Sequence, residues 1–459
     1  MIQDAVDLAL TEGLHGHSRA ASLRLPGSKP FAVGEVSGND TILTRIRAED
    51  VPALHRDPVD PFARGIAETI LKDIREKGEP ALIEHATRLG DMEKGAKHIL
   101  LPAEMKAHYD SLSDADRGVL DRTAARIKLF AQTQRDSITE TSLKLDGGEA
   151  GQSVAAVDVA GCYAPGGRYP LPSSVLMGAV TARVAGVKTV WVASPHPDPV
   201  TCAAAYVAGA DGLLMVGGAQ AIGAFAYGAG DVPVCDAIVG PGNKFVTAAK
   251  SMIAGAVAID MLAGPSECLV LADETSNPTI AAADLIAQAE HDTAARALLV
   301  CTSEDMISQI DLEIQKQLET LPTVETARAA IVNNSFAVKV SSIVEAADIV
   351  NRLAPEHLEI HTKNSDEDAK LMNHFGAIFI GMNGAEVLGD YGAGPNHTLP
   401  TGGTARSYGG LSVHTFLRCR TWLRVDDCEG ARVMIQDAVD LALTEGLHGH
   451  SRAASLRLT

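Results

Sequence analysis

Short apolar runs recur through most of this chain, those of the first series end in glycine or proline, and stretches of helical composition separate them. The first series comprises VAAVDVAGCYAPGG, VKTVWVAS, GLLMVGG and AIVGPGN, and the second comprises CLVLADE, ARALLVCTS, FAVKVSS and AIFIGM. Runs without polar alternation predict strands of a parallel sheet that is buried on both faces, and the stretches between them predict crossover helices. We therefore expect an α/β protein with two such units.

One string of 25 residues occurs twice, at residues 1–25 and again, letter for letter, at residues 434–458. Roughly four hundred unrelated residues separate the copies, whereas the repeats of a solenoid lie next to one another. Each copy predicts an amphipathic helix and carries one glutamate and two histidines. These residues are Glu12, His15 and His17 in the first copy, and Glu445, His448 and His450 in the second. We expect the second copy to be the functional one.

Composition excludes some classes of protein. The formal net charge of −19 and the absence of a basic run argue against nucleic acid as a main partner. The seven cysteines show no CxxC spacing, which favours reduced thiols over a disulfide framework. No stretch approaches the roughly 20 apolar residues that a membrane-spanning helix needs. These features predict a cytoplasmic enzyme, with import into an organelle left open.

Three glycine-rich clusters follow apolar runs of the first series, namely Tyr163 to Gly167, Gly217 to Gln220 and Gly240 to Asn243. Ligands of open α/β sheets bind beyond the carboxyl ends of strands, where backbone N–H groups can face a phosphate. None of the clusters is a GxGxxG fingerprint, so tight turns remain an alternative. Gln220 and Asn243, next to glycine pairs, favour a dinucleotide site.

Two segments of the second series carry residues that ligate metals. Gln288 and His291 lie three residues apart in AAADLIAQAEHD, whose composition favours a helix, so both side chains are expected on one face. Asp390 and His397 lie in the glycine-rich string GDYGAGPNH, which we expect to be a loop. Carboxylate oxygen and imidazole nitrogen are ligands of zinc, while a solvated helix end is the alternative for the first segment.

Two further segments combine glutamate with histidine. Glu356 and His357 follow Pro355, which ends the preceding helical pattern, and an adjacent acid and base suit proton transfer. The string from Glu445 to His450 could instead be a helix end, since glycine stops helices and histidine favours the negative end of the helix dipole.

Taken in order, these strings resemble the histidinol dehydrogenase family from about residue 60 to the end of the chain. The strings are GCYAPGG, LPSSVLM, GGAQAIGA, VGPGN, IDMLAGPSE, AADLIAQAEH, APEHLEI, GDYGAGPNHTLPT and EGLHGH. The resemblance implies a zinc-dependent dehydrogenase that oxidises an amino alcohol through the aldehyde to the acid with two NAD+ in succession. It also implies a homodimer in which the C-terminal segment of one subunit completes the active site of the other.

The resemblance assigns roles to particular residues. It implies that one zinc ion per subunit is bound by Gln288, His291, Asp390 and His450, and that Glu356 and His357 are catalytic. It implies NAD contacts at Tyr163, Gln220 and Asn243. It implies substrate contacts at Ser266, Gln288, His291, His357, Asp390, Glu445 and His450, with His397 as a further candidate. A neutral histidine suits abstraction of the alcohol proton near pH 7, so we expect His357 to be the base and Glu356 to activate the water that hydrates the aldehyde.

The expected domains follow from the same resemblance. Residues 1–40 form an N-terminal arm and linker, and residues 412–459 form the segment that completes the partner's site. Residues 41–141 together with 266–411 form a first α/β domain that carries most metal and catalytic residues. Residues 142–265 form a second, NAD-binding α/β domain. The fold expected is thus two incomplete Rossmann-like domains with a helical N-terminal arm and a dimer-swapped C-terminal segment.

Two features leave the substrate open. Arg168 and Tyr169 follow Gly166 and Gly167 where histidinol enzymes usually have small residues. This string, together with the sequence around His414, resembles a branch of the family that includes sulfopropanediol dehydrogenases, and an arginine there could pair with an anionic group. L-Histidinol is the substrate expected, sulfopropanediol or another alcohol is the alternative, and a non-catalytic ligand-binding homologue is a third.

The repeat adds a local question. The two identical strings can compete for one position. If residues 1–25 dock where residues 434–458 belong, His17 can replace His450 as a zinc ligand.

Overall fold

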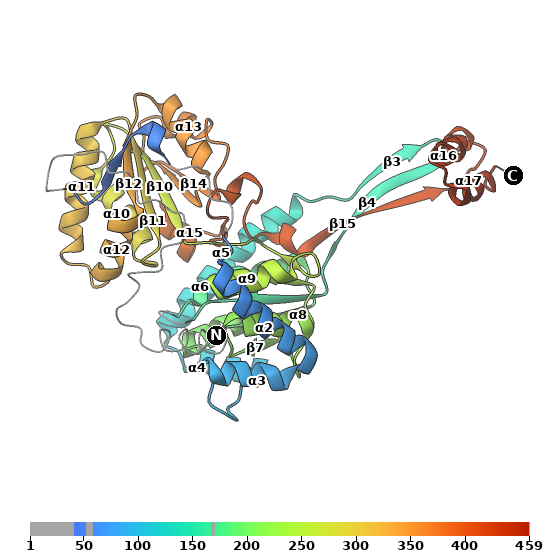
Figure 1. Ribbon diagram of the computed structural model, residues 1–459, viewed down its shortest axis with the longest axis horizontal. Coiled ribbons are helices and arrows are strands. Elements are labelled where there is room, and N and C mark those ends of the chain that lie inside the picture. The colour runs from blue at the N-terminus through green and yellow to red at the C-terminus, as the bar shows by residue number, and fades with distance from the viewer. Residues whose placement is uncertain (1–40, 52–57, 167–169, 459) are drawn as a thin grey trace.

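The computed structural model describes residues 41–51, 58–166 and 170–458. Within these residues the chain forms two six-stranded sheets and one three-stranded sheet (Figure 1). Helices cover both faces of each six-stranded sheet, so the α/β prediction with two units is confirmed. All seven cysteines are free thiols, as the sequence predicted, and five of them are buried. Among the described residues, no helix is both long and apolar enough to cross a membrane.

The first sheet is wholly parallel, with the strand order β1-β12-β11-β10-β13-β14. Its strands are β1 (Thr44–Ile46), β10 (Glu267–Ala272), β11 (Arg296–Cys301), β12 (Phe336–Lys339), β13 (His357–Ile360) and β14 (Ala377–Ile380). The predicted run CLVLADE gives β10, in which every residue is buried. β10 and β13 pair with Cys268 opposite His357, which places the amino end of β13 beside the amino end of β10.

Helices pack on both faces of this sheet. They are α10 (Pro278–Ala289), α11 (Glu304–Leu318), α12 (Val324–Asn334), α13 (Ile343–Leu353), α14 (Ser365–Ala369) and α15 (Glu386–Tyr391). The helices α10, α11 and α12 cover one face, and α13 covers the other. The amino end of α10 is well defined by its sequence. The Asn277 side chain caps the helix by accepting from the N–H groups of Thr279 and Ile280, and Pro278 occupies the first helical position.

The second sheet has the order β2-β7-β6-β5-β8-β9 and is parallel except for the edge pair β2 and β7. Its strands are β2 (Ile99–Leu100), β5 (Val159–Tyr163), β6 (Thr189–Ala193), β7 (Gly212–Leu214), β8 (Ala237–Val239) and β9 (Ala258–Ile259). One face carries α2 (Pro61–Lys77), α3 (Glu79–Arg88), α8 (Gly218–Tyr227) and α9 (Lys244–Ile253). The other carries α4 (Pro102–Ser111), α5 (Asp114–Asp136), α6 (Pro172–Ala185) and α7 (Pro199–Val207).

The helices of residues 61–136 belong with this second sheet. The sequence predicted residues 41–141 as part of the first domain, and of that range only the described residues 42–51, which include β1, pack with the first sheet. The reason is the apolar face of α2, where Ile70, Leu71 and Ile74 are buried in the same core cluster as Ile222 and Phe225 of α8. Packing of this kind between distant parts of the chain cannot be read from the amphipathic pattern of α2 alone.

The third sheet is an antiparallel ribbon of β15 (Leu417–Val425), β4 (Gly148–Ala156) and β3 (Thr141–Leu145). It leads to α16 (Arg432–Thr444) and α17 (His448–Ser455), which pack against each other. Figure 1 shows the ribbon carrying these two helices away from both six-stranded sheets. We call β3, β4, β15, α16 and α17 the arm. Glu445 caps the carboxyl end of α16 and Gly446, with φ +75°, follows it, so the string begins as the helix end that was the alternative interpretation, and His448 then begins α17.

Candidate active site

The carboxyl end of α10 carries the first two candidate metal ligands. Gln288 lies in the last turn of α10 and is fully buried, and neither atom of its side-chain amide has a hydrogen-bond partner among the described residues. His291 lies two residues beyond the helix end, after Glu290 as the cap, so it is not strictly helical as predicted. Buried polar atoms without partners are costly, and a cation that takes a lone pair from the Gln288 oxygen would remove part of that cost.

The short helix α15 faces His291 with two carboxylates. Asp390 Oδ2 lies 3.7 Å from His291 Nε2, and Glu386 Oε1 lies 3.5 Å from the same nitrogen. Our expectation that Asp390 lies in a loop was wrong, because residues 386–391 form a helix that buries both carboxylates. We did not identify Glu386 from the sequence, although its spacing of four residues from Asp390 would place both on one helix face.

The amino end of β13 supplies the adjacent acid and base. His357 Nδ1 lies 3.2 Å from the carbonyl oxygen of Glu267, to which it can donate, while Nε2 is buried without a partner in the described chain. Glu356 Oε2 accepts from the Glu267 N–H at 3.0 Å. His357 Nε2 lies 3.9 Å from Asp390 Oδ1, so β13 and α15 bring the predicted base beside a predicted metal ligand.

The carboxylates around His357 determine its electrostatics. Burial lowers the pKa of His357, but Glu386, Glu356 and Asp390 outweigh it and raise this pKa to about 9. Burial also raises the pKa of Glu356 to about 8, against the opposing effect of His357. Burial and the neighbouring Glu386 raise the pKa of Asp390. Such shifts are typical of active sites, and concentrated negative charge is suited to a cation.

A pocket of about 250 Å³ opens beside this group. His357, Asp390 and His397 contribute its titratable side chains, and Ile378, Phe379 and Leu388 are among its apolar walls. Burial lowers the pKa of His397, whose Nε2 atom has no partner among the described residues. The pocket therefore combines apolar walls with imidazole and carboxylate groups, which is the usual character of a small-molecule site.

The three glycine-rich clusters end β5, β7 and β8 at one edge of the second sheet. Tyr163 is buried, and its hydroxyl accepts from the Gly218 N–H at 3.2 Å. Gln220 donates from Nε2 to Asp91 Oδ2 at 2.6 Å, and Asn243 caps α9. The clusters thus meet at the carboxyl edge of a parallel sheet, while the side chains of the three predicted NAD contacts form hydrogen bonds within the protein. We did not identify Asp91 from the sequence, and no motif there indicates it.

The remaining predicted residues lie elsewhere. Ser266 is half-buried just before β10, whereas Glu445 and His450 are exposed at the far end of the arm, away from α15 (Figure 1). One chain therefore brings His291 and Asp390 together, with Gln288 three residues before His291, whereas His450 lies on the arm. Glu12, His15 and His17, like Arg168 and Tyr169, lie outside the described residues.

Comparison with known proteins shows what this arrangement belongs to. The family model for histidinol dehydrogenase matches residues 59–458, which is most of the chain. The chain belongs to the histidinol dehydrogenase family. Among relatives, the histidinol dehydrogenase of Cupriavidus pinatubonensis is 41% identical over 417 residues, which cover 89% of this chain and 93% of that protein. That of Bordetella parapertussis is 40% identical over 427 residues, covering 92% and 95%.

A solved structure agrees with these relatives. The crystal structure of histidinol dehydrogenase from Elizabethkingia anophelis matches with a TM-score of 0.85 and 30% identity, covering 91% of this chain and 98% of that chain. The resemblance inferred from the motifs is thus confirmed over nearly the whole length. The chain is an enzyme, an NAD-dependent oxidoreductase of the histidinol dehydrogenase type.

Proposed function

We propose that this enzyme oxidises L-histidinol to L-histidine in two successive hydride transfers to NAD+, with the aldehyde between them, as a step of histidine biosynthesis. The observation that carries the proposal is the convergence of His291, Asp390 and His357, with His357 and Asp390 lining one pocket and the buried amide of Gln288 three residues before His291. It occurs in a chain about 40% identical to named histidinol dehydrogenases over most of its length.

His357 is the proposed base. Its Nδ1 atom can donate to the Glu267 carbonyl, which would leave the lone pair of the neutral ring on Nε2. Glu386, Glu356 and Asp390 raise the pKa of His357 to about 9, so the ring would be a neutral base near pH 7 only when a bound cation offsets these carboxylates. In that neutral ring Nε2, which is buried and has no partner in the described chain, is available to take the hydroxyl proton of the alcohol while hydride leaves the same carbon. The orientation of the ring is thus fixed by the backbone of β10.

Glu356 is proposed to serve the second half-reaction. The aldehyde must add water before a second hydride can leave, and a carboxylate can take a proton from that water. Because burial raises the pKa of Glu356 to about 8, this group can both take and release a proton near neutral pH. Its hydrogen bond from the Glu267 N–H keeps it beside His357.

The donor set fits zinc, because it combines an imidazole nitrogen, a carboxylate oxygen and a buried amide oxygen that lacks a partner. We propose Gln288, His291, Asp390 and His450 as the ligands. When bound, the ion would anchor the imidazole and amine of the substrate and offset the carboxylates around His357. For NAD+, we propose the edge formed by Tyr163, Gln220 and Asn243, where α8 and α9 begin.

A homodimer follows from the proposed ligand set. His450 is exposed on the arm, remote from the other three ligands of its own subunit, so we propose that each arm completes the site of a partner subunit. Exposed apolar side chains on the arm support this, with Leu423, Val433 and Leu441 each more than 60% accessible. Glu445 would enter the partner's substrate site with His450, while Ser266 would contribute from its own subunit. The cytoplasmic location stays a prediction.

The test is NADH formation by zinc-loaded protein with L-histidinol and, in parallel, with 2,3-dihydroxypropane-1-sulfonate. We expect two NADH per L-histidinol consumed and no turnover of the sulfonate. Turnover of the sulfonate alone would contradict the proposal and make Arg168, outside the described residues, the leading contact for an anionic substrate. Absence of turnover with both would contradict the proposal and indicate that the enzyme oxidises another alcohol.

A further inference from the structure

A second group of ligand-type side chains lies beneath the proposed zinc centre. Asp284 is on α10, one turn before Gln288, and Glu359 and His361 follow His357 at alternate positions of β13 and its end. Side chains two residues apart on a strand share a face, and helix positions four apart do too. The two groups thus form neighbouring rows between α10 and β13, with a spacing of about 6 Å, the rise of four helical residues or of two strand residues.

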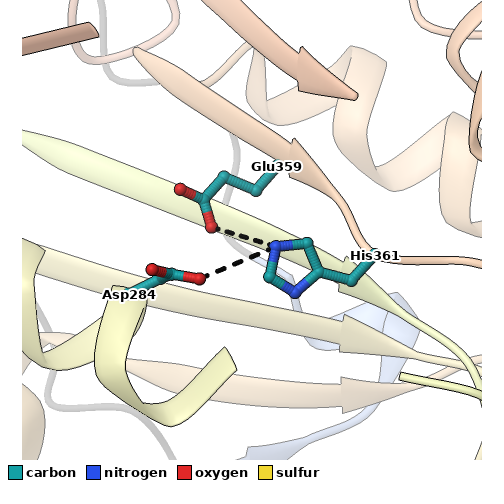
Figure 2. A group of neighbouring side chains, drawn as sticks. All are labelled: Asp284, Glu359 and His361. Carbon is teal, nitrogen blue, oxygen red and sulfur yellow. Dashed lines mark ion pairs between the residues drawn. The ribbon is translucent and has the colours of Figure 1, made fainter. Parts of the chain in front are cut away.

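The three side chains converge on one point. His361 Nε2 lies 3.3 Å from Glu359 Oε2 and 3.7 Å from Asp284 Oδ2, and Figure 2 shows both carboxylates turned toward that nitrogen. The larger separation is too long for a hydrogen bond. Ligands of a tetrahedral zinc ion at its usual bond lengths are separated by about 3.4 Å. The two observed separations lie on either side of this value.

Burial makes this cluster costly without a cation. Glu359 and His361 are fully buried, and Asp284 is 9% exposed. Four of their polar atoms, namely Asp284 Oδ2, Glu359 Oε2, His361 Nδ1 and His361 Nε2, have no hydrogen-bond partner among the described residues. Two buried carboxylates beside one imidazole are unfavourable as ions unless their charge is paired, protonated or bound to a metal.

We propose that Asp284, Glu359 and His361 bind a second divalent cation of the zinc class, distinct from the proposed centre at His291 and Asp390. Three protein ligands leave one position for water in a tetrahedral shell. The site is closed to substrate, so the role of the ion is structural. Glu359 links it to the active site, because its other oxygen, Oε1, accepts from the Glu386 N–H at the start of α15 at 2.6 Å.

Metal content tests the proposal with the complete chain. The protein is stripped with a chelator, reloaded with Zn2+ alone and freed of excess, and zinc per subunit is measured by mass spectrometry. We expect two ions in the wild type, one in His291→Asn, one in His361→Gln and none in the double variant. Glu367→Gln, at an exposed carboxylate on α14, is the matched control and should hold two.

His291→Asn keeps the proposal testable even if His361→Gln fails to fold, because it leaves the second cluster intact. Loading this variant with Co2+ should give the visible absorption of a tetrahedral ion and raise its melting temperature. One ion in the wild type and none in His291→Asn would overturn the proposal and leave a metal-free cluster that shares a proton. If instead the proposed centre at His291 and Asp390 does not bind zinc and the second cluster does, the wild type and His291→Asn should each hold one ion and His361→Gln none.

Discussion

The two ring nitrogens of His357 have different surroundings, and this difference defines what the residue can do. Nδ1 faces a backbone carbonyl, a partner that does not change charge, while Nε2 is buried near Asp390 with no hydrogen-bond partner in the described chain. A backbone acceptor selects the tautomer of a neutral ring. The position of β10 beside β13 therefore prepares the side chain for proton transfer.

Replacing His357 by asparagine should remove the base and leave the metal ligands in place. We expect kcat with L-histidinol to fall by about 10²–10⁴-fold, the usual contribution of a general base. Zinc content should not change. His108→Asn on α4, remote from the site, is the control and should keep wild-type kcat. Loss of zinc together with activity would instead assign His357 to the metal centre.

Glu356→Gln separates the two half-reactions. The amide keeps the size of the side chain and can still accept from the Glu267 N–H, but it cannot take a proton from water. We expect one NADH per L-histidinol, with the aldehyde accumulating, where the wild type gives two. Stopped-flow absorbance with aldehyde trapping measures both products. If the stoichiometry stays at two while kcat falls, Glu356 does not activate the water.

At the scale of elements, the position of α15 relative to β14 determines where Asp390 lies. A Cβ atom at Gly389 would lie 2.9 Å from the Phe379 ring of β14, closer than side chains tolerate. Gly389→Ala should therefore displace α15, weaken zinc binding and lower the free energy of unfolding by about 1–3 kcal/mol, as overpacking does. Urea unfolding and zinc titration measure the two effects.

Gly65→Ala is the matched control for that change. Gly65 lies in α2, and a Cβ atom there has nothing within 4 Å. Alanine in an open helical position stabilises by about 0.5–1 kcal/mol. If the free energy of unfolding falls in Gly389→Ala and rises in Gly65→Ala, the loss at Gly389 comes from its contact with Phe379. If both substitutions change this free energy by small and equal amounts, α15 adjusts to the added Cβ atom without cost.

The elements also show where sequence reasoning reaches its limit. Apolar runs predicted four strands of each large sheet, because residues buried on both faces of a sheet form continuous apolar segments, but β1, β2, β9 and β13 were not predicted. The catalytic pair and three metal ligands followed from motifs in single segments, and their roles stay predictions. Glu386 lies in no motif, and α2 joins the second sheet through contacts with α8 that no local pattern records. Packing between distant parts of the chain determines both the position of Glu386 in the site and the sheet on which α2 packs.

At the scale of the whole molecule, the arm separates residues that the proposed chemistry requires together. Within one subunit, α17 lies at the end of the ribbon, far from α15 (Figure 1). Two identical subunits resolve this if each arm reaches the other subunit, since a two-fold dimer makes that exchange twice. The identical string at residues 1–25 complicates a test, because His17 could replace His450, so the subunits compared should lack residues 1–25.

Mixed dimers then test the exchange directly. His357→Asn has an intact arm but no base, and His450→Gln has an intact base but lacks the fourth ligand, so each variant alone should be inactive. In a hybrid with exchanged arms, one site combines both defects and the other has none. Random assembly of equal amounts should restore about a quarter of wild-type activity, because half of the dimers are hybrids and each has one intact site of two. If each arm served its own subunit, the hybrid would contain no intact site and co-refolding would restore no activity.

The role of the first copy of the repeat is tested separately, with His450→Gln alone. If this variant is active when residues 1–25 are present and loses its activity when they are removed, His17 takes the place of His450 as a ligand.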